Sequence, residues 1–323
     1  MTTPNESLPM YFPAAPFDLN DAVICSALVN AAYDMYNQWV AQESPSNPSE
    51  FLWELPTNPI IPNGPNLSFI GPLWGVPTMT EIQYPEPFAF FASDTSTDKT
   101  YLAVRGSETA ADFWEDADIN QVSYDLIVPG FGLVHAGFLD IYTGSYSGWD
   151  YSVESLQSTI MSTLAGLSYA PSLLYVASHS LGAGLSTLAV PDIAINSAVS
   201  NGKVPLLHYT LASPRVGDPS FAYNYNFQVP APTFRIFNTE DIVPYGPPPV
   251  LPDSVYEHVG TPISFTAQYG TTDGNHQYED CYFYALNNPN QPQGPVNSVV
   301  ESPRLRMAEA RQRHDLLKRN SNV

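Results

Sequence analysis

The sequence contains few basic residues, and this shortage limits the partners it can bind. Only 11 of its 323 residues are lysine or arginine, against 32 aspartates and glutamates, for a formal net charge of −21. Residues 1 to 300 hold 5 of the basic residues and 29 of the acidic ones, a balance of −24. Nucleic acids and anionic membranes bind through lysine and arginine that neutralise phosphate. We therefore expect no nucleic-acid partner and no anionic lipid surface.

Cysteines and long apolar runs are also scarce. The two cysteines, Cys25 and Cys281, are too few for a disulfide framework or a zinc site. They are either one long-range disulfide or two buried thiols. No stretch approaches the roughly 18 apolar residues of a membrane helix, so we expect no transmembrane segment. The N-terminus shows no secretory signal, which makes the cytoplasm the default location, although the low lysine content also suits an extracellular protein.

The remaining composition is that of a globular protein, with 44% hydrophobic and 13% aromatic residues. We interpret residues 1–300 as a single domain and residues 301–323 as a short basic tail, and we expect a monomer. Ten prolines between residues 44 and 87 exclude regular helix and central strand there. Because Trp53, Phe69 and Trp74 lie in this stretch, we expect an ordered loop that packs on the body.

Helical and strand patterns alternate along the rest of the chain. We expect helices over residues 19–42 and 151–167, and a helix from Leu181 that Pro191 ends or kinks. A hairpin is predicted from F-A-F-F-A-S and T-Y-L-A-V-R, followed by apolar strands in S-L-L-Y-V-A-S, P-L-L-H-Y-T-L-A-S, T-F-R-I-F-N-T and E-H-V-G-T-P-I-S-F. This alternation predicts an α/β fold with a mostly parallel central sheet flanked by helices.

The pattern S-H-S-L-G at residues 178–182 stands between a predicted strand and a helix rich in small residues. A serine at such a sharp turn projects above the sheet, and the next backbone N–H can hold a developing oxyanion. The turn is tight, so the residues two before and two after the serine must be small. Ser178 and Gly182 meet this condition, although Ser178 replaces the usual glycine. The pattern indicates Ser180 as a nucleophile.

A nucleophilic serine needs a base and an acid that orients the base. His276 lies downstream in the polar loop T-T-D-G-N-H-Q-Y, where a side chain can reach over the end of a sheet, whereas the other histidines lie in strands, upstream or in the tail. His179 adjoins Ser180, and its side chain should point away from that of the serine. Asp241 directly follows a predicted strand and is the best-placed acid, with Asp218 as its competitor.

Five blocks of the sequence together resemble the class 3, or fungal-type, lipase family of α/β-hydrolases. In family order they are L-A-V-R-G-S (102–107), V-H-A-G-F-L-D-I-Y (134–142), S-H-S-L-G (178–182), L-A-S-P-R-V-G-D (211–218) with F-N-T-E-D-I-V-P (237–244), and H-V-G-T-P (258–262) with N-H-Q-Y (275–278). The resemblance implies the α/β-hydrolase fold and the triad Ser180, Asp241 and His276.

The resemblance also implies that Ser107 and the Leu181 N–H form the oxyanion hole, and that Asp218 and His258 are structural. It implies a disulfide near the positions of Cys25 and Cys281, but Cys281 follows His276 by only five residues. Ala183 and Gly184 stand in the reverse of the family's usual order. No metal or organic cofactor is needed for this chemistry, and we expect none.

The family's lid falls at residues 108–118, where Phe113 and Trp114 belong to an apolar stripe that could contact substrate. Five carboxylates in the same stretch would repel anionic phospholipid. We therefore expect a lipase or esterase that cleaves neutral esters, foremost acylglycerols. The substrate could be met at a lipid–water interface. The alternatives are an esterase for aromatic cell-wall or short-chain esters, a phospholipase A1 or acyltransferase, and a non-catalytic relative.

Overall fold

The computed structural model describes residues 17–77, 84–107, 119–197 and 204–295. Seven strands form the central sheet in the order β1-β2-β3-β8-β9-β10-β11. The pairs β1–β2 and β2–β3 are antiparallel, and the four pairs from β3 to β11 are parallel. The strands are β1 (Ser68–Gly75), β2 (Glu86–Asp94), β3 (Lys99–Val104), β8 (Leu173–His179), β9 (Leu206–Leu211), β10 (Thr233–Asn238) and β11 (Thr261–Phe265).

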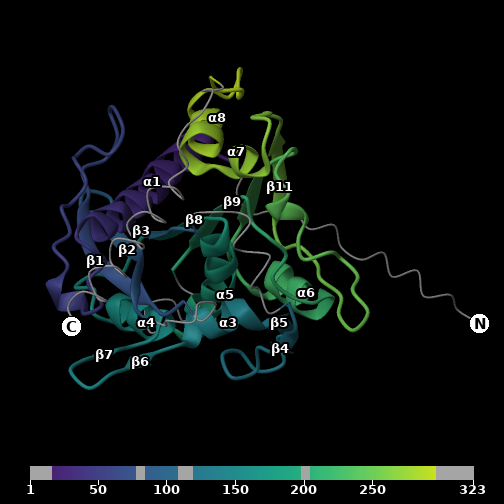
Figure 1. Cartoon of the computed structure of the whole chain (residues 1–323), viewed down its shortest axis with the longest axis horizontal. Coiled ribbons are helices and arrows are strands. Elements are labelled where there is room, and N and C mark those ends of the chain that lie inside the picture. Colours follow the sequence, from purple (N-terminus) through teal and green to yellow (C-terminus); the bar gives the residue numbers. More distant parts are fainter. Residues whose placement is uncertain (1–16, 78–83, 108–118, 198–203, 296–323) are drawn as a thin grey trace, which may run out of the picture.

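Helices cover both faces of this sheet (Figure 1). The helices are α1 (Leu19–Ala41), α3 (Ala136–Thr143), α4 (Leu156–Ala165), α5 (Leu181–Asn196), α6 (Pro219–Gln228), α7 (Thr272–His276) and α8 (Tyr284–Asn287). Two small hairpins, β4 (Gln121–Ser123) with β5 (Leu133–His135) and β6 (Tyr146–Ser147) with β7 (Ser152–Val153), lie at the periphery. The α/β-hydrolase fold and its mostly parallel sheet are thus confirmed.

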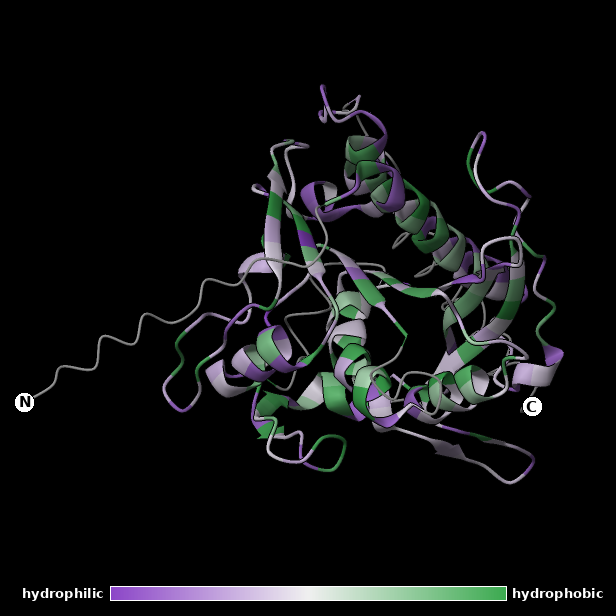
Figure 2. Cartoon of the chain, turned by 180° about the vertical axis from the view of Figure 1, so that it is seen from behind, coloured by the Kyte–Doolittle hydropathy of each residue, from purple (hydrophilic) through white to green (hydrophobic). Residues whose placement is uncertain are grey.

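The core is divided into two layers by the alternation of side chains along the strands. On β2, Phe90 and Ala92 pack toward α1 and the C-terminal turns, whereas Ala89 and Phe91 pack toward the layer of α3, α4, α5 and α6. Nearly every residue of β2, β3, β8 and β9 is buried. Strands covered on both faces lose strict alternation of polarity, which explains their apolar sequences. Figure 2 shows hydrophobic residues along these strands and helices.

The N-terminal helix forms because its sequence supplies both a cap and an apolar face. Asp18 accepts hydrogen bonds from the Asn20 and Asp21 N–H groups at 2.7 and 3.2 Å, which satisfies donors that an isolated helix end leaves unpaired. The helix packs on β2, β3 and β8 through residues such as Leu28, Ala32 and Met35. The predicted helix over residues 19–42 is confirmed to within one residue.

The proline-rich stretch is ordered in its described residues and packs on the body, as expected. The Trp53 ring lies 6.3 Å from that of Phe69 and 5.2 Å from that of Phe90. The stretch also contributes β1, which the sequence did not predict. Pro72 is tolerated there because β1 is an edge strand whose register shifts on either side of Leu73.

Two helices differ from their predicted limits. The helix after Ser180 was predicted to end or kink at Pro191, and it does not end there but continues to Asn196. Proline removes one backbone hydrogen bond, and the complete burial of Leu181 through Ala194 outweighs that loss. The helix predicted over residues 151–167 spans only Leu156–Ala165, because Ser152 and Val153 pair in β7 and Ser155 caps the helix.

Candidate active site

Ser180 lies between the end of β8 and the start of α5, in a backbone conformation that serine rarely adopts. Its φ is +55° and its ψ is −125°. Such conformations cost on the order of 1–3 kcal/mol and persist only where the surroundings fix them. The Ser180 N–H donates to the Leu211 carbonyl on β9 at 2.9 Å, and its carbonyl accepts from Ala183 N–H at 2.8 Å. A β-carbon on Gly182 would collide with the Arg105 carbonyl oxygen, so only glycine fits there.

Ser178 fits at the other end of the elbow because its hydroxyl has a partner on α5. Its Oγ lies 2.7 Å from Ser186 Oγ, which is itself 2.8 Å from His208 Nε2. The chain continues from His208 Nδ1 to the Tyr225 hydroxyl at 2.7 Å. Every member is buried, and every member is bonded, so the serine replaces the usual glycine without leaving an unpaired polar group.

The structure brings Ser180, His276 and Asp241 into one continuous chain of hydrogen bonds. His276 Nε2 lies 2.7 Å from Ser180 Oγ, and His276 Nδ1 lies 2.8 Å from Asp241 Oδ2. All three residues are buried. Since a carboxylate only accepts hydrogen bonds, Nδ1 carries the proton that points to Asp241, which leaves Nε2 free to accept from the serine hydroxyl. This is the geometry that activates a serine.

Asp241 is held by two further donors. Its Oδ1 accepts from the Val243 N–H at 2.9 Å, and its Oδ2 accepts from the Tyr282 hydroxyl at 2.6 Å. Tyr282 is fully buried, and its oxygen accepts in turn from the Asn238 N–H at 3.0 Å. Burial and the neighbouring Asp241 raise the pKa of Tyr282 well above its usual value, so it remains a donor. Tyr282 lies in the π-helical turn Tyr278–Phe283, and no motif in the sequence indicated its role.

The acid loop and the histidine loop are tied together by two asparagine side chains. Asn238 Nδ2 donates to the carbonyls of Ala267 and Asn275 at 2.8 and 3.1 Å. Asn275 Nδ2 donates back to the Glu240 carbonyl at 3.0 Å. Each loop therefore holds the other, one residue before His276 and one residue before Asp241.

The candidate oxyanion donors follow two neighbouring strands. Ser107 comes three residues after β3, and Leu181 begins α5 after β8; β3 and β8 pair directly. The first N–H groups of a helix have no carbonyl partner within it. The loop before Ser107 contacts the elbow closely, since a β-carbon on Gly106 would lie 2.7 Å from that of Ser180.

His179 lies beside the triad, a position that its adjacency to Ser180 did not predict. Its ring centroid is 4.8 Å from that of His276, and its Nδ1 lies 2.7 Å from the Tyr33 hydroxyl. The Tyr33 oxygen also accepts from the Gly106 N–H at 3.0 Å, so this tyrosine connects the His179 ring to the loop before Ser107. Burial, reinforced by His276, lowers the pKa of His179 well below its usual value. This neutral ring supports His276 by packing.

The competing residues have structural positions. Asp218 caps α6, since its Oδ1 accepts from the Phe221 N–H at 2.7 Å, and it also accepts from the Leu133 N–H at 3.1 Å. His258 Nε2 is 2.8 Å from the Pro244 carbonyl oxygen. Cys25 and Cys281 are both buried free thiols, so the disulfide implied by the family resemblance is not formed. Phe113 and Trp114 and the tail at 301–323 lie outside the described residues.

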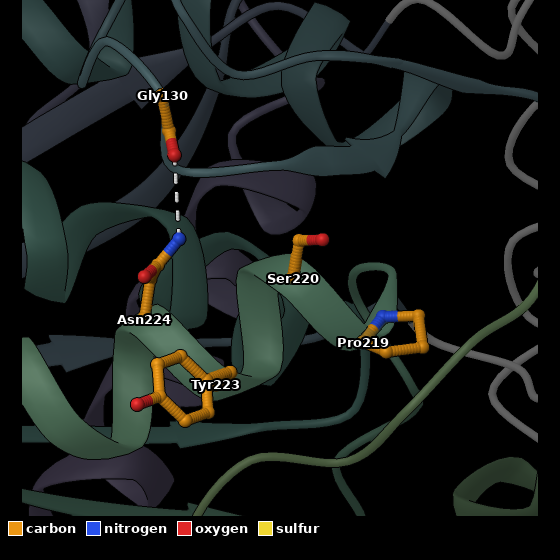
Figure 3. Close-up of a pocket in the computed structure, with 5 residues that line it drawn as sticks. All are labelled: Gly130, Pro219, Ser220, Tyr223 and Asn224. Carbon is orange, nitrogen blue, oxygen red and sulfur yellow. Dashed lines mark hydrogen bonds between the residues drawn. The ribbon is translucent and has the colours of Figure 1, made fainter.

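Other features of the described chain do not add a second site to this one. A shallow pocket on α6, lined by Gly130, Pro219, Ser220, Tyr223 and Asn224, contains no triad residue (Figure 3). Its one internal hydrogen bond runs from Asn224 Nδ2 to the Gly130 carbonyl at 3.3 Å. Within the described ranges, no cluster of histidine, cysteine and carboxylate residues could hold a metal ion, and no helix is long and apolar enough to cross a bilayer.

Comparison with known proteins identifies relatives of this arrangement. Residues 101–251 match the family described as lipase (class 3). A protein named phospholipase A1-II 3 from Oryza sativa subsp. indica is 33% identical over 175 residues, which cover 50% of this chain and 41% of that protein. A protein named lipase from Rhizomucor miehei is 32% identical over 164 residues, which cover 50% of this chain and 40% of that protein.

The chain thus matches about two fifths of the length of these relatives. The solved structure of the Rhizomucor miehei triacylglyceride lipase has the same fold, with a TM-score of 0.51 at 23% identity, covering 78% of this chain and 82% of that one. The matched range includes the candidate nucleophile Ser180 and the candidate acid Asp241, whereas His276 lies beyond it. Over residues 101–251, which are 151 of its 323 residues, the chain is therefore similar to the class 3 lipase family.

Proposed function

We propose that the protein hydrolyses carboxylic esters through an acyl-enzyme on Ser180. The observation that carries this proposal is the chain of hydrogen bonds from Ser180 Oγ through His276 to Asp241, at 2.7 and 2.8 Å. A buried serine in a strained turn, bonded to a histidine that is itself oriented by a carboxylate, has no evident structural purpose.

The reaction follows from these positions. His276 Nε2 takes the Ser180 proton while Oγ attacks the ester carbonyl carbon, and the carbonyl oxygen becomes an oxyanion near the Ser107 and Leu181 donors. His276 then gives the proton to the departing alcohol oxygen, which leaves an ester on Ser180. A water molecule, deprotonated by His276, attacks that ester, and His276 returns the proton to Ser180 Oγ as the carboxylic acid leaves. Asp241 stabilises the imidazolium in both steps and does not take the proton itself.

For the substrate, we propose neutral acyl esters, with acylglycerols first. The balance of −24 over residues 1–300 disfavours anionic phospholipid surfaces. A second candidate is phospholipase A1 activity, which the name of the relative from Oryza sativa favours. Hydrolysis rates on a triacylglycerol emulsion, on phosphatidylcholine vesicles, on phosphatidylglycerol vesicles and on feruloyl esters separate the candidates. Faster release of the sn-1 acyl chain from phosphatidylglycerol than from triacylglycerol would contradict our preference.

The catalytic proposal is tested by substitution of Ser180 and Ser107. Ser180→Ala is expected to lower kcat on p-nitrophenyl esters by about 10^6-fold, to the background of binding and the oxyanion hole. Ser107→Ala, which removes the hydroxyl donor and keeps the backbone N–H, is expected to cost about 10^2 to 10^3-fold, as for the loss of one oxyanion donor. Retained hydrolysis in the Ser180→Ala protein would contradict the assignment of Ser180 as the nucleophile, and an undiminished rate in Ser107→Ala would exclude the Ser107 hydroxyl as an oxyanion donor.

A further inference from the structure

Arg105 carries a permanent charge, although only 2% of its surface is exposed. Each face and each edge of its guanidinium is occupied. The guanidinium carbon lies 3.8 Å from the centroid of the Tyr36 ring on α1 and 4.4 Å from that of Phe88 on β2. Nη2 forms an ion pair with Glu86 Oε2 at 2.7 Å, and Nε donates to the Pro87 carbonyl at 2.8 Å. The group is thus fixed to β2 and α1.

The third nitrogen of this group, Nη1, bonds the loop that carries Ser107. Arg105 Nη1 donates to the Gly106 carbonyl oxygen at 2.8 Å. The Gly106 carbonyl and the Ser107 N–H belong to the same planar trans peptide and point in opposite directions. A group that holds the carbonyl in place therefore fixes the direction of the Ser107 N–H. On this geometry we propose that Arg105 is a positioning residue, which orients the Ser107 backbone N–H as an oxyanion donor beside the Ser107 hydroxyl.

The peptide on the other side of Gly106 is held as well. The Gly106 N–H donates to the Tyr33 hydroxyl at 3.0 Å. A β-carbon on Gly106 would lie 2.6 Å from that hydroxyl oxygen and 2.7 Å from the Ser180 β-carbon. The loop is therefore confined between α1 and the elbow, and Arg105 is the only polar side chain among the described residues that bonds the Gly106 carbonyl.

Arginine suits this position because its three nitrogens lie in one plane and donate hydrogen bonds in fixed directions. A lysine keeps the charge and can retain Glu86, but its single ammonium group cannot reach Pro87, Glu86 and Gly106 in the same geometry. Arg105→Lys should therefore leave the charge of the core unchanged and loosen the Gly106–Ser107 peptide. A misplacement of about 1 Å at a catalytic group can cost as much as 10^2-fold in rate.

The inference rests on the proposed ester hydrolysis, and it is tested by variants compared with active wild-type protein. Arg105→Lys is expected to lower kcat by about 10- to 100-fold with KM little changed, since the donor acts on the oxyanion and not on the bound ester. The affinity for an alkyl boronic acid, which forms a tetrahedral anion on Ser180, should fall by a similar factor. Glu86→Gln, which keeps the Nη1 bond but weakens its anchor, should change both quantities in the same direction and by less.

Tyr124→Phe is the matched control, because it also removes one buried hydrogen bond to a backbone carbonyl, that of Leu188, without touching the loop. It should lower the melting temperature and leave boronic acid affinity relative to KM unchanged. Equal boronic acid affinity in wild type, Arg105→Lys and Glu86→Gln would overturn the inference, as would a loss that merely follows the melting temperature, with KM rising in parallel. If Arg105→Lys does not fold, Glu86→Gln decides by the same criterion. A wild type inactive on every ester would overturn the proposed function itself, and this inference with it.

Discussion

Restoring the usual glycine at the elbow, in the variant Ser178→Gly, should make the protein less stable. The Ser178 hydroxyl lies 2.7 Å from Ser186 Oγ in a fully buried chain, so the variant loses one satisfied hydrogen bond. Ser186 keeps its bonds to His208 and to the Ala183 carbonyl, and no polar group is left without a partner. The loss is therefore that of a normal buried hydrogen bond, about 1 kcal/mol.

Glycine adds a backbone term to this loss. A glycine inside a strand costs roughly 0.5–1 kcal/mol relative to alanine, because it has more freedom to lose on folding. Ser178→Ala should then reduce the free energy of unfolding by about 1 kcal/mol, and Ser178→Gly by about 2 kcal/mol. Catalysis should change by less than about 3-fold in both, since Ser178 Oγ bonds α5 and not the triad.

Urea denaturation of the two variants and the wild type measures the first effect, and kcat on a p-nitrophenyl ester measures the second. The alanine variant separates the lost hydrogen bond from the glycine term. An increase in stability or activity in Ser178→Gly would refute the reasoning, because it would mean that the serine strains the elbow.

Two further predictions concern the acid and the pH dependence of stability. Asp241→Asn should lower kcat by about 10^4-fold by favouring the wrong tautomer of His276, whereas Asp218→Asn should affect only the melting temperature; the reverse result would exchange their roles. Burial lowers the pKa of His208 to about 3 from an ordinary value near 6.5. Between these two pH values the unfolded chain binds a proton at His208 and the folded protein does not. The free energy of unfolding therefore falls by about 1.4 kcal/mol per pH unit as pH falls from about 6.5 toward 3. Urea denaturation at pH 7 and pH 5 measures how steeply the free energy of unfolding changes with pH. In His208→Gln this slope should be smaller by about 1.4 kcal/mol per pH unit, the value for one proton, and an unchanged slope would contradict the prediction.

Much of the fold and the candidate triad could be predicted from local patterns. A buried strand, a tight turn and a helix of small residues lie next to each other in the chain, and they indicated both the elbow and Ser180. The parallel order of strands then brings the loops after β8, β10 and β11 to one edge of the sheet, where Asp241 and His276 were expected. The catalytic role assigned to these residues stays a prediction until the variants are measured.

The supporting contacts could not be predicted, because they join residues that are distant in sequence. Tyr33 and His179 are 146 residues apart, and Tyr282 and Asp241 are 41 apart. Tyrosines are frequent in this sequence, 20 in all, and no local pattern distinguishes those that bond the triad from those that fill the core. The length of α5 was misjudged for a similar reason, since the burial that compensates for Pro191 comes from other parts of the chain.

Asn238 and Asn275 position the loops of Asp241 and His276 and take no part in the proposed chemistry. Asp241 and His276 lie on separate loops. The hydrogen bond between them requires the distance from Nδ1 to Oδ2 to be correct to within a few tenths of an ångström. Asn238 precedes the acid by three residues and bonds the histidine loop, while Asn275 precedes the histidine by one and bonds the acid loop. Asn238 uses both amide donors and its acceptor, and Asn275 uses one donor and its acceptor, so a displacement of either loop would break bonds on both. The relative position of Asp241 and His276 thus depends on Asn238 and Asn275 as well as on the hydrogen bond between the two residues themselves.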